Sequence, residues 1–413
     1  MSRIEKHDMP LQDMDPYLQS WSEPESGLAF WWGQLERGKP EHLLVLPLYE
    51  ESDNILTCLA SLERSARFAG IRPLIILVVN NREKDPDSVR LDNQRTLKLL
   101  WNLISAPCLC PEPFRGFCGS LDWAELLVVD RSSKGHEFPE KQGVGLARKI
   151  GGDLACTLFR HGFTSAAYAR TTDADALFPE DYFKDPGIHG GAGQAAAYIF
   201  PFVHRAPQGS CPEQKDAVDL YHRYLCDYTR GLREAGSPYA FATIGSAICF
   251  SLYHYALVRG FPARMAGEDF YFLNKLRKTG EIRELSSAPL ILQGRLSSRV
   301  PFGTGQGIRQ IMDCFRMGQP WKHYPDHAFI QLRYWLRALD CYCEHEDPER
   351  FFSDYNHLVA NGSRRSQDIL VHLKMEPFLR SLPRRAPRVS VRKQQMMVCF
   401  DAFRTMKFIH YVS

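Results

Sequence analysis

Two aspartates two positions apart, Asp173 and Asp175, follow the strand-like run AAYAR. A turn at the end of a strand can direct both carboxylates, directly or through water, at one divalent cation. Such oxygen ligands favour Mg²⁺ or Mn²⁺. Most acidic triplets of this kind are solvated turns, so the spacing alone does not distinguish a metal site from a surface turn. The position directly after a strand favours the metal site.

A second acidic pair, Glu268 and Asp269, follows Gly267 at the expected start of a helix in AGEDFYFLNKL. Acidic residues favour the first turn of a helix because they complement its dipole. A carboxylate at this position can also act as a general base on a hydroxyl held beside it. Gly267 would let a substrate approach the backbone closely.

Two glycine-marked basic segments have the composition of anion-binding sites. In EKQGVGLARKIGGDLA, Lys141 and Arg148 flank a predicted helix start, where backbone amides and an arginine can hold a phosphate. The glycine spacing does not fit the dinucleotide fingerprint, which argues against a nicotinamide enzyme. In GRLSSRVPFGTGQG, Arg295 and Arg299 lie in what is either a loop that orders over an anionic ligand or a plain surface turn.

Alternating apolar strands and amphipathic helices must position these side chains. The runs HLLVLPLY and LIILVVNN predict strands on either side of a helix that Ser52 caps and that ends near Phe68. Next come a helix over 89–104, a Cys/Pro-rich loop, a strand over 125–129, a helix over 142–159 and a strand over 166–170. The strands are almost continuously apolar, which predicts an α/β fold with a mostly parallel sheet flanked by helices. Ligands of such sheets bind outside the carboxyl ends of the strands.

Length and composition set further limits. The chain has 413 residues, with 44% apolar and 24% charged residues, which excludes a fibrous or wholly disordered protein. We expect an N-terminal helical extension over 1–40, an α/β domain over 41–305 and a helical C-terminal region over 306–413. In the last region, amphipathic stretches over 328–342 and 349–359 have no strand between them. The net charge of +3 is too nearly balanced to indicate a nucleic-acid binder.

Cysteine use and hydropathy bear on location. Twelve cysteines, with no signal-peptide pattern in the first twenty residues, predict reduced thiols and a cytoplasmic protein. No window reaches the 18 or more consecutive apolar residues that a membrane span needs. The basic stretch 380–407 also carries apolar residues, a composition typical of a segment that rests on an anionic membrane surface. A solvated helix face is the commoner explanation of such a charge run, and both interpretations stay open.

Six segments, taken in order, resemble the family 2 glycosyltransferases of the GT-A fold. They are LPLYEESDNILTCLASL, LIILVVNN, GVGLARKIGGDLA, TTDADALFPEDYF, IGSAICFSLYHYALVRGFP and AGEDFYF. The resemblance covers about residues 41 to 280. It implies an enzyme that uses Mg²⁺ or Mn²⁺ to move a sugar from a nucleotide-diphospho-sugar to an acceptor hydroxyl. Inversion at the anomeric carbon follows from the resemblance alone, since some GT-A enzymes retain configuration.

The resemblance also implies roles for individual residues. Asp173 and Asp175 would hold the metal, Asp269 would act as the base, and Glu268 would orient the base or the acceptor. The implied donor site comprises Pro47, Tyr49, Glu50, Asn80, Asn81, Lys141, Arg148, Asp173 and Arg299. The implied acceptor side comprises Gly245, Ser246 and Gly267.

The sequence departs from the family pattern at two places. The second strand of the family usually ends in an acidic residue that reads the base, whereas Asn80 and Asn81 stand here. An amide can still donate and accept hydrogen bonds, so base recognition remains possible while the choice of base is open. Beyond Gly280 no clear Q-x-x-R-W motif follows, and Arg299 in RVPFGTG is the candidate to replace its arginine.

Other functions fit less well. A nucleotidyltransferase that makes a nucleotide sugar would need basic residues after the first strand, where residues 50–53 are mostly acidic. A nucleotide or glycan sensor without activity would not need all three of Asp173, Asp175 and Asp269. A zinc site from Cys108, Cys110 and Cys118, completed by Cys211 or by Cys341, Cys343 and His345, lacks paired CxxC motifs. His323 or His327 could supply a third ligand to the divalent cation, although a structural histidine is the commoner case.

Overall fold

A computed structural model describes residues 10–35, 37–184, 195–296, 303–321, 323–345, 348–359 and 364–413 of the chain. The chain divides into two compact units. The first comprises the chain up to Asp219 together with Thr243–Gln310, and the second comprises Leu220–Ala242 together with Ile311–Ser413. This division differs from the predicted segments 1–40, 41–305 and 306–413. The described N-terminal residues belong to the first unit, and the second unit takes Leu220–Ala242 from within the predicted α/β segment.

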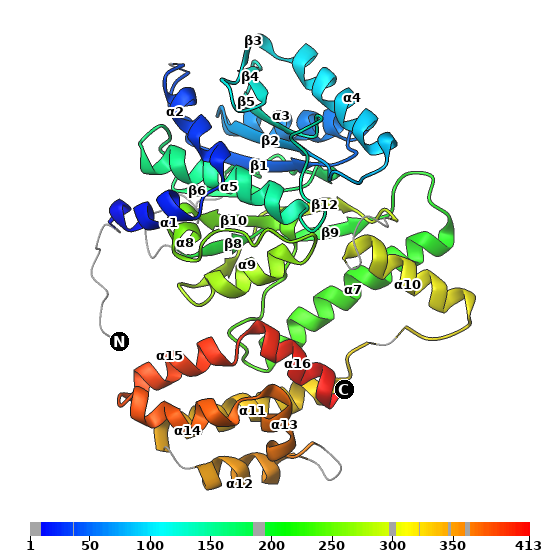
Figure 1. Cartoon of the computed structure of the whole chain (residues 1–413). Coiled ribbons are helices and arrows are strands. Elements are labelled where there is room, and N and C mark those ends of the chain that lie inside the picture. The colour runs from blue at the N-terminus through cyan, green and yellow to red at the C-terminus, as the bar shows by residue number, and fades with distance from the viewer. Residues whose placement is uncertain are drawn as a thin grey trace. The chain divides into compact units, whose positions relative to one another are not determined.

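The first unit is built on a nine-stranded sheet in the order β11-β8-β10-β6-β1-β2-β5-β4-β3 (Figure 1). The strands are β1 (Leu43–Leu48), β2 (Leu74–Asn80), β3 (Ser105–Leu109), β4 (Gly116–Ser120), β5 (Glu125–Arg131), β6 (Tyr168–Thr171), β8 (Ala197–Ile199), β10 (Ile248–Ser251) and β11 (Ile282–Glu284). The four central strands β6, β1, β2 and β5 are parallel. A smaller sheet has the order β7 (Ala176–Leu177), β12 (Leu290–Gln293) and β9 (Phe202–Arg205). These strands confirm the predicted α/β class.

Helices cover this sheet, and helix α5 packs on β1 and β2. The helical elements are η1 (Leu11–Met14), α1 (Asp15–Ser20), η2 (Pro24–Gly27), α2 (Leu28–Gly33), α3 (Ile55–Ala69), α4 (Asp87–Leu103), α5 (Val144–Arg160), η3 (Gly245–Ala247), α8 (Leu252–Leu257) and α9 (Glu268–Leu276). In α3 the residues Ile55, Cys58, Leu59 and Leu62 are buried, as their helical spacing predicts. Ser52 does not cap this helix as expected, because α3 begins at Ile55 and the Ser52 hydroxyl donates instead to Asp92.

The predicted Cys/Pro-rich loop contains a β-hairpin that the sequence analysis missed. Strands β3 and β4 pair antiparallel, and β4 continues the main sheet beside β5. The residues of β3, SAPCL, are mostly exposed. An exposed edge strand with a central proline shows neither the apolar run nor the alternation on which the strand prediction depends.

The second unit is helical, which confirms the prediction for the C-terminal region. It contains α11 (Asp326–His345), α12 (Pro348–Leu358), α13 (Ser366–Leu373), α14 (Glu376–Arg385), α15 (Val389–Cys399) and α16 (Ala402–Val412), while α7 (Pro212–Glu234) and α10 (Thr304–Arg316) each contribute residues to both units. Its core surrounds Trp335, which is fully buried. Within the described residues no helix is both long and apolar enough to cross a bilayer.

Several of the basic residues in 380–407 have partners inside the second unit. Arg392 is buried and donates to the carbonyl oxygens of Cys343, Ala386 and Pro387. Lys393 pairs with Asp340 and Glu344. The folded chain therefore presents fewer of these positive charges to solvent than the sequence alone suggests.

Candidate functional site

Several of the predicted site residues lie where strands of the main sheet end at one edge. The parallel strands β1 and β6 lead at that edge into Glu51 and into the pair Asp173 and Asp175. Strand β10 runs antiparallel to β6, so that its beginning lies at the same edge, preceded by η3. Topology thus brings together residues that lie far apart in the sequence.

Arg148 links two of the predicted acidic positions. Its Nη1 and Nη2 atoms donate to Asp173 Oδ1 at 3.1 and 2.8 Å, and its Nε atom donates to Glu268 Oε1 at 3.0 Å. The Arg148 side chain is only 3% exposed, whereas that of Asp173 is 34% exposed. Arg148 was predicted to bind the donor phosphates. Its buried guanidinium holds the carboxylates of Asp173 and Glu268, and the phosphate-binding role stays a prediction.

The η3 turn connects Asp269 to Asp173. The Gly245 backbone N–H donates to Asp269 Oδ2 at 3.0 Å, and the Ser246 hydroxyl donates to Asp173 Oδ2. A Cβ atom on Gly245 would lie 2.3 Å from Arg148 Nη2, so only glycine leaves room for the guanidinium. Gly245 and Ser246, predicted on the acceptor side, therefore position the acidic residues.

Helix α9 places Glu268 and Asp269 in its first turn. Gly267 precedes the helix with φ of +72°, a left-handed conformation that glycine adopts without strain. Burial, with a smaller contribution from the neighbouring Asp269 carboxylate, raises the pKa of Glu268 to about 8, although Arg148 opposes the shift. Burial also raises the pKa of Asp269, against the effects of Arg148 and of two backbone N–H donors. A raised pKa suits a group that takes up a proton near neutral pH.

A second arginine contacts the other metal-site aspartate. Arg295 Nε lies 2.8 Å from Asp175 Oδ2, and Arg295 Nη2 donates to Glu51 Oε1. Glu51 also accepts a hydrogen bond of 2.8 Å from Asn54 Nδ2. The pKa of the buried Cys58 thiol is raised, first by burial and then by the carboxylates of Asp175, Glu51 and Asp173. Those three carboxylates therefore all lie within electrostatic range of Cys58.

The donor set fits a divalent cation. The carboxylates of Glu51, Asp173 and Asp175 lie beside Arg148 and Arg295, while the raised pKa values of Glu268 and Asp269 reduce the negative charge that these two groups carry. Within the described residues no three His, Cys, Asp or Glu side chains are grouped closely enough to enclose a metal. Mg²⁺ commonly binds through one or two carboxylates and completes its shell with substrate phosphates and water. Asp173 and Asp175 supply that number.

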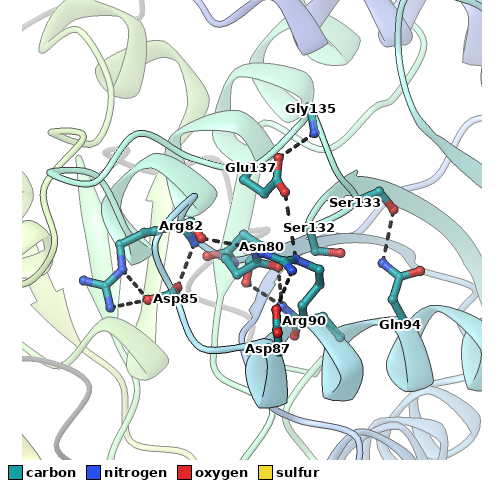
Figure 2. A network of polar contacts seen from close by, with 12 residues as sticks. Asn80, Arg82, Asp85, Asp87, Arg90, Gln94, Ser132, Ser133, Gly135 and Glu137 are labelled. Carbon is teal, nitrogen blue, oxygen red and sulfur yellow. Dashed lines mark hydrogen bonds and ion pairs between the residues drawn. The ribbon is translucent and has the colours of Figure 1, made fainter.

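The predicted nucleotide side is a polar network at the ends of β2 and β5. Asn80 is 3% exposed, and its Nδ2 atom donates to the carbonyl oxygens of Leu48 and Val78 at 3.0 and 3.1 Å. Asn81 is 1% exposed and accepts from Asn93 at 3.0 Å. Figure 2 shows Asn80 among Arg82, Asp85, Asp87, Arg90, Gln94, Ser132, Ser133, Gly135 and Glu137. Both asparagine side chains thus hold the strand ends together.

Other predicted donor residues take different positions. Pro47 is buried within β1, while Tyr49 and Glu50 are partly exposed after it. Burial raises the pKa of Tyr49 to about 12, with Asp85 adding to the shift and Arg82 opposing it. Lys141 is exposed before α5. Arg299 lies outside the described residues.

The alternative metal ligands are the histidines and cysteines considered in the sequence analysis. His323 and His327 belong to the second unit, where His327 Nε2 contacts the carbonyl oxygen of Val412 at 3.1 Å. All twelve cysteines are free thiols. Cys108 and Cys118 face each other across the β3–β4 hairpin.

Sequence reasoning did not link Glu51 and Arg295 to the predicted metal ligand Asp175. The two residues are separated by 244 positions, and no local motif links them. The signals available were the position of Glu51 after a strand and the glycine-punctuated segment around Arg295. Both signals predict a loop near a ligand, and neither predicts that the two side chains pair.

The solved structures similar to this chain include S. aureus TarS and the mannosyltransferase PcManGT. No family model matches the chain, and no curated protein matches it. Residues 1–349 of S. aureus TarS, in complex with UDP-GlcNAc, match 87% of this chain and 89% of their own length at 11% identity, with a TM-score of 0.40. A mannosyltransferase, PcManGT from Pyrobaculum calidifontis in complex with GDP-Man and Mn²⁺, matches 94% of this chain and 97% of its own at 15% identity, with a TM-score of 0.35. These TM-scores are too low to assign a shared fold or activity by themselves.

Proposed function

We propose that the chain is a metal-dependent glycosyltransferase that moves a sugar from a nucleotide-diphospho-sugar to an acceptor hydroxyl with inversion. The observation that carries the proposal is the convergence of Asp173, Glu268 and Asp269 around Arg148 and the η3 turn. Together with Arg148 and η3, these residues come from four separate segments, and their arrangement provides a candidate cation-binding carboxylate beside a candidate base. The resemblance of the sequence motifs to GT-A enzymes supports the same reaction.

The proposed chemistry assigns one task to each group. Asp173 and Asp175 would hold Mg²⁺ or Mn²⁺, which when bound stabilises negative charge on the leaving diphosphate. Arg148 and Ser246 fix the Asp173 carboxylate in direction. Asp269 would take the proton of the acceptor hydroxyl, and the raised pKa of the carboxyl group increases its affinity for that proton. Glu268 acts through Arg148 as a positioning residue.

The metal requirement is tested by calorimetry of nucleoside diphosphate binding. We expect binding that depends on Mn²⁺ or Mg²⁺, and we expect Asp175→Asn to abolish the benefit of added metal. Asp227→Asn is the matched control, because Asp227 is a residue of α7 whose side chain is 45% exposed and pairs with Arg230. Equal affinity of the wild-type protein with and without a chelator would refute the metal role.

The base is tested separately by Asp269→Asn. We expect donor binding to remain nearly intact while sugar transfer stops, because the amide cannot accept the proton. Retained transfer would remove Asp269 as the base. Thermal-shift measurements against a panel of nucleoside diphosphates with Mn²⁺ would identify the base of the donor, since binding to the folded state raises its stability.

A nucleotidyltransferase remains the second candidate from another class. It would handle a triphosphate beside the loop after β1, where Glu50, Glu51 and Asp53 are acidic. The basic residue in contact with that loop is Arg295, whose charge Glu51 and Asp175 already balance. The site therefore supports sugar transfer better. Membrane contact through the basic stretch 380–407 stays a prediction, and of its basic residues Arg392 and Lys393 have partners within the second unit.

A further inference from the structure

Arg295 occupies the place of a cation between two carboxylates. Its guanidinium lies between Glu51, which follows β1, and Asp175, which follows β6, while Arg295 itself follows β12. Three separate segments of the first unit thus meet at one positive charge. The Arg295 side chain is 24% exposed, whereas that of Glu51 is 5% exposed. The arginine therefore covers the carboxylates from the side of the solvent.

The two contacts of Arg295 are unequal. Arg295 Nη2 donates a hydrogen bond to Glu51 Oε1. Arg295 Nε lies 2.8 Å from Asp175 Oδ2 but makes no hydrogen bond, because its N–H does not point at a suitable acceptor. The link to Asp175 is thus electrostatic only and lacks the added strength of an aligned, charge-assisted hydrogen bond.

The surrounding charge favours such a competitor. Asp173 lies close enough to affect Arg295 electrostatically, in addition to Asp175 and Glu51. Arg148 divides its own charge among Asp173, Glu268 and Asp269, and Arg295 makes direct contact with Glu51 and Asp175. A divalent cation brings two charges in a smaller volume, and carboxylate oxygens are its preferred ligands.

We propose that Glu51 and Asp175 form a carboxylate pair that Arg295 and the divalent cation occupy in competition, so that Arg295 holds the pair until the metal replaces it. Glu51 thereby becomes a further metal-site residue of the chain. The inference rests on the proposed function, because it concerns the metal of the same site. Its consequence is that Mn²⁺ alone binds the wild-type protein weakly, since binding requires Arg295 to leave.

The test is the affinity for Mn²⁺ alone, measured by calorimetry on the full chain without nucleotide. We expect Arg295→Met to tighten Mn²⁺ binding about tenfold or more, which corresponds to about 1.4 kcal/mol. Arg295→Lys should tighten it less, because lysine keeps a competing charge. Arg283→Met is the matched control, since Arg283 pairs with Glu281 on the surface and should leave the affinity unchanged. An affinity of Arg295→Met equal to or weaker than that of the wild type would overturn the competition.

A second measurement covers the case in which Arg295→Met is unstable without metal. Saturating Mn²⁺ should then raise its melting temperature by more than that of the wild type, because binding to the folded state stabilises it. Adding Glu51→Gln to Arg295→Met should remove most of the gain in affinity, and an unchanged gain would exclude Glu51. These outcomes are separable from the proposed function. Failure of every protein to bind nucleoside diphosphate would refute the transferase, whereas an unchanged affinity for Mn²⁺ would refute only the competition.

Discussion

Gly245 leaves room for the Arg148 guanidinium in the acidic site. Because glycine has no Cβ, Arg148 Nη2 can lie 2.3 Å from the position that a Cβ atom would occupy. We expect Gly245→Ala to displace the guanidinium, to cost about 1–3 kcal/mol of stability as overpacking does, and to weaken metal-dependent nucleotide binding. Thermal melts and calorimetry measure the two effects. In the control Gly27→Ala, the new methyl group would make a tight contact of 3.3 Å with the Phe114 ring, so we expect a smaller loss of stability and no change in nucleotide binding. Unchanged nucleotide binding by Gly245→Ala would mean that the Arg148 position is not critical.

Lys275 predicts a pH dependence of stability. Burial, reinforced by the charges of Lys149 and Arg259, lowers the pKa of Lys275 from 10.5 to about 8 in the folded chain. Between about pH 8 and 10.5 the unfolded chain therefore binds more protons at this lysine than the folded chain does. Stability contributed by this group consequently rises with pH across that window.

The corresponding variant is Lys275→Met. We expect the wild type to gain melting temperature relative to Lys275→Met between pH 7.5 and pH 10, because only the wild type loses the cost of a buried charge. Neutral lysine can still donate to the carbonyl oxygens of Val258 and Gly260, which accept from its Nζ atom. Lys98→Met, on the exposed face of α4, corrects for general effects of removing a lysine. A constant difference between wild type and Lys275→Met over this range would contradict the prediction.

At the scale of elements, the N-terminal helices are attached to α5 by a buried charge network. Asp153 is fully buried and accepts hydrogen bonds from Lys149 Nζ at 2.7 Å, from Tyr255 at 2.6 Å, from the Glu23 backbone at 2.7 Å and from the Tyr17 hydroxyl. We expect Asp153→Asn to cost about 3–5 kcal/mol, because it removes the nearer of the two carboxylates that pair with the buried Lys149 charge and leaves only Glu23 at 3.8 Å. The change should appear in chemical unfolding curves.

The chain provides a matched control for this network. Asp15 also joins the N-terminal segment to α5, through Arg160 at 2.7 Å, but its side chain is 34% exposed. Surface ion pairs contribute about 0–1 kcal/mol, so Asp15→Asn should change stability little. Similar losses in Asp15→Asn and Asp153→Asn would show that burial is not what makes the Asp153 network strong.

The elements also show how far the sequence could predict this structure. Strands β1, β2, β5 and β6 were predictable because each is an apolar run followed by polar residues. The same strand ends placed Asp173 and Asp175 correctly at a common edge. The β3–β4 hairpin was not predictable, because β3 is mostly exposed. The burial of Asn80 and Arg148 was also unpredictable, since it depends on which side chains the strand ends bring against them.

At the scale of the whole molecule, the two units have separate apolar cores. The core of the first unit surrounds the central strands, for example Leu46 and Leu77, and that of the second surrounds Trp335. Because the second unit consists of Leu220–Ala242 and Ile311–Ser413, the chain leaves the first unit and returns to it. A chain with two cores can unfold in more than one step, and a single free energy of unfolding does not then describe it.

Trp335→Ala distinguishes one cooperative unit from two. Trp335 is fully buried, with the rings of Phe351 and Tyr355 each 5.3 Å away, so its truncation should cost about 3–5 kcal/mol. We expect differential scanning calorimetry to give two transitions, of which Trp335→Ala lowers one and Asp153→Asn lowers the other, with additive effects in the double variant. Trp335→Phe keeps an aromatic ring and should lower the same transition as Trp335→Ala by a smaller amount. If both variants instead lowered one common transition, the two cores would unfold together, and the second unit would stabilise the site-bearing unit directly.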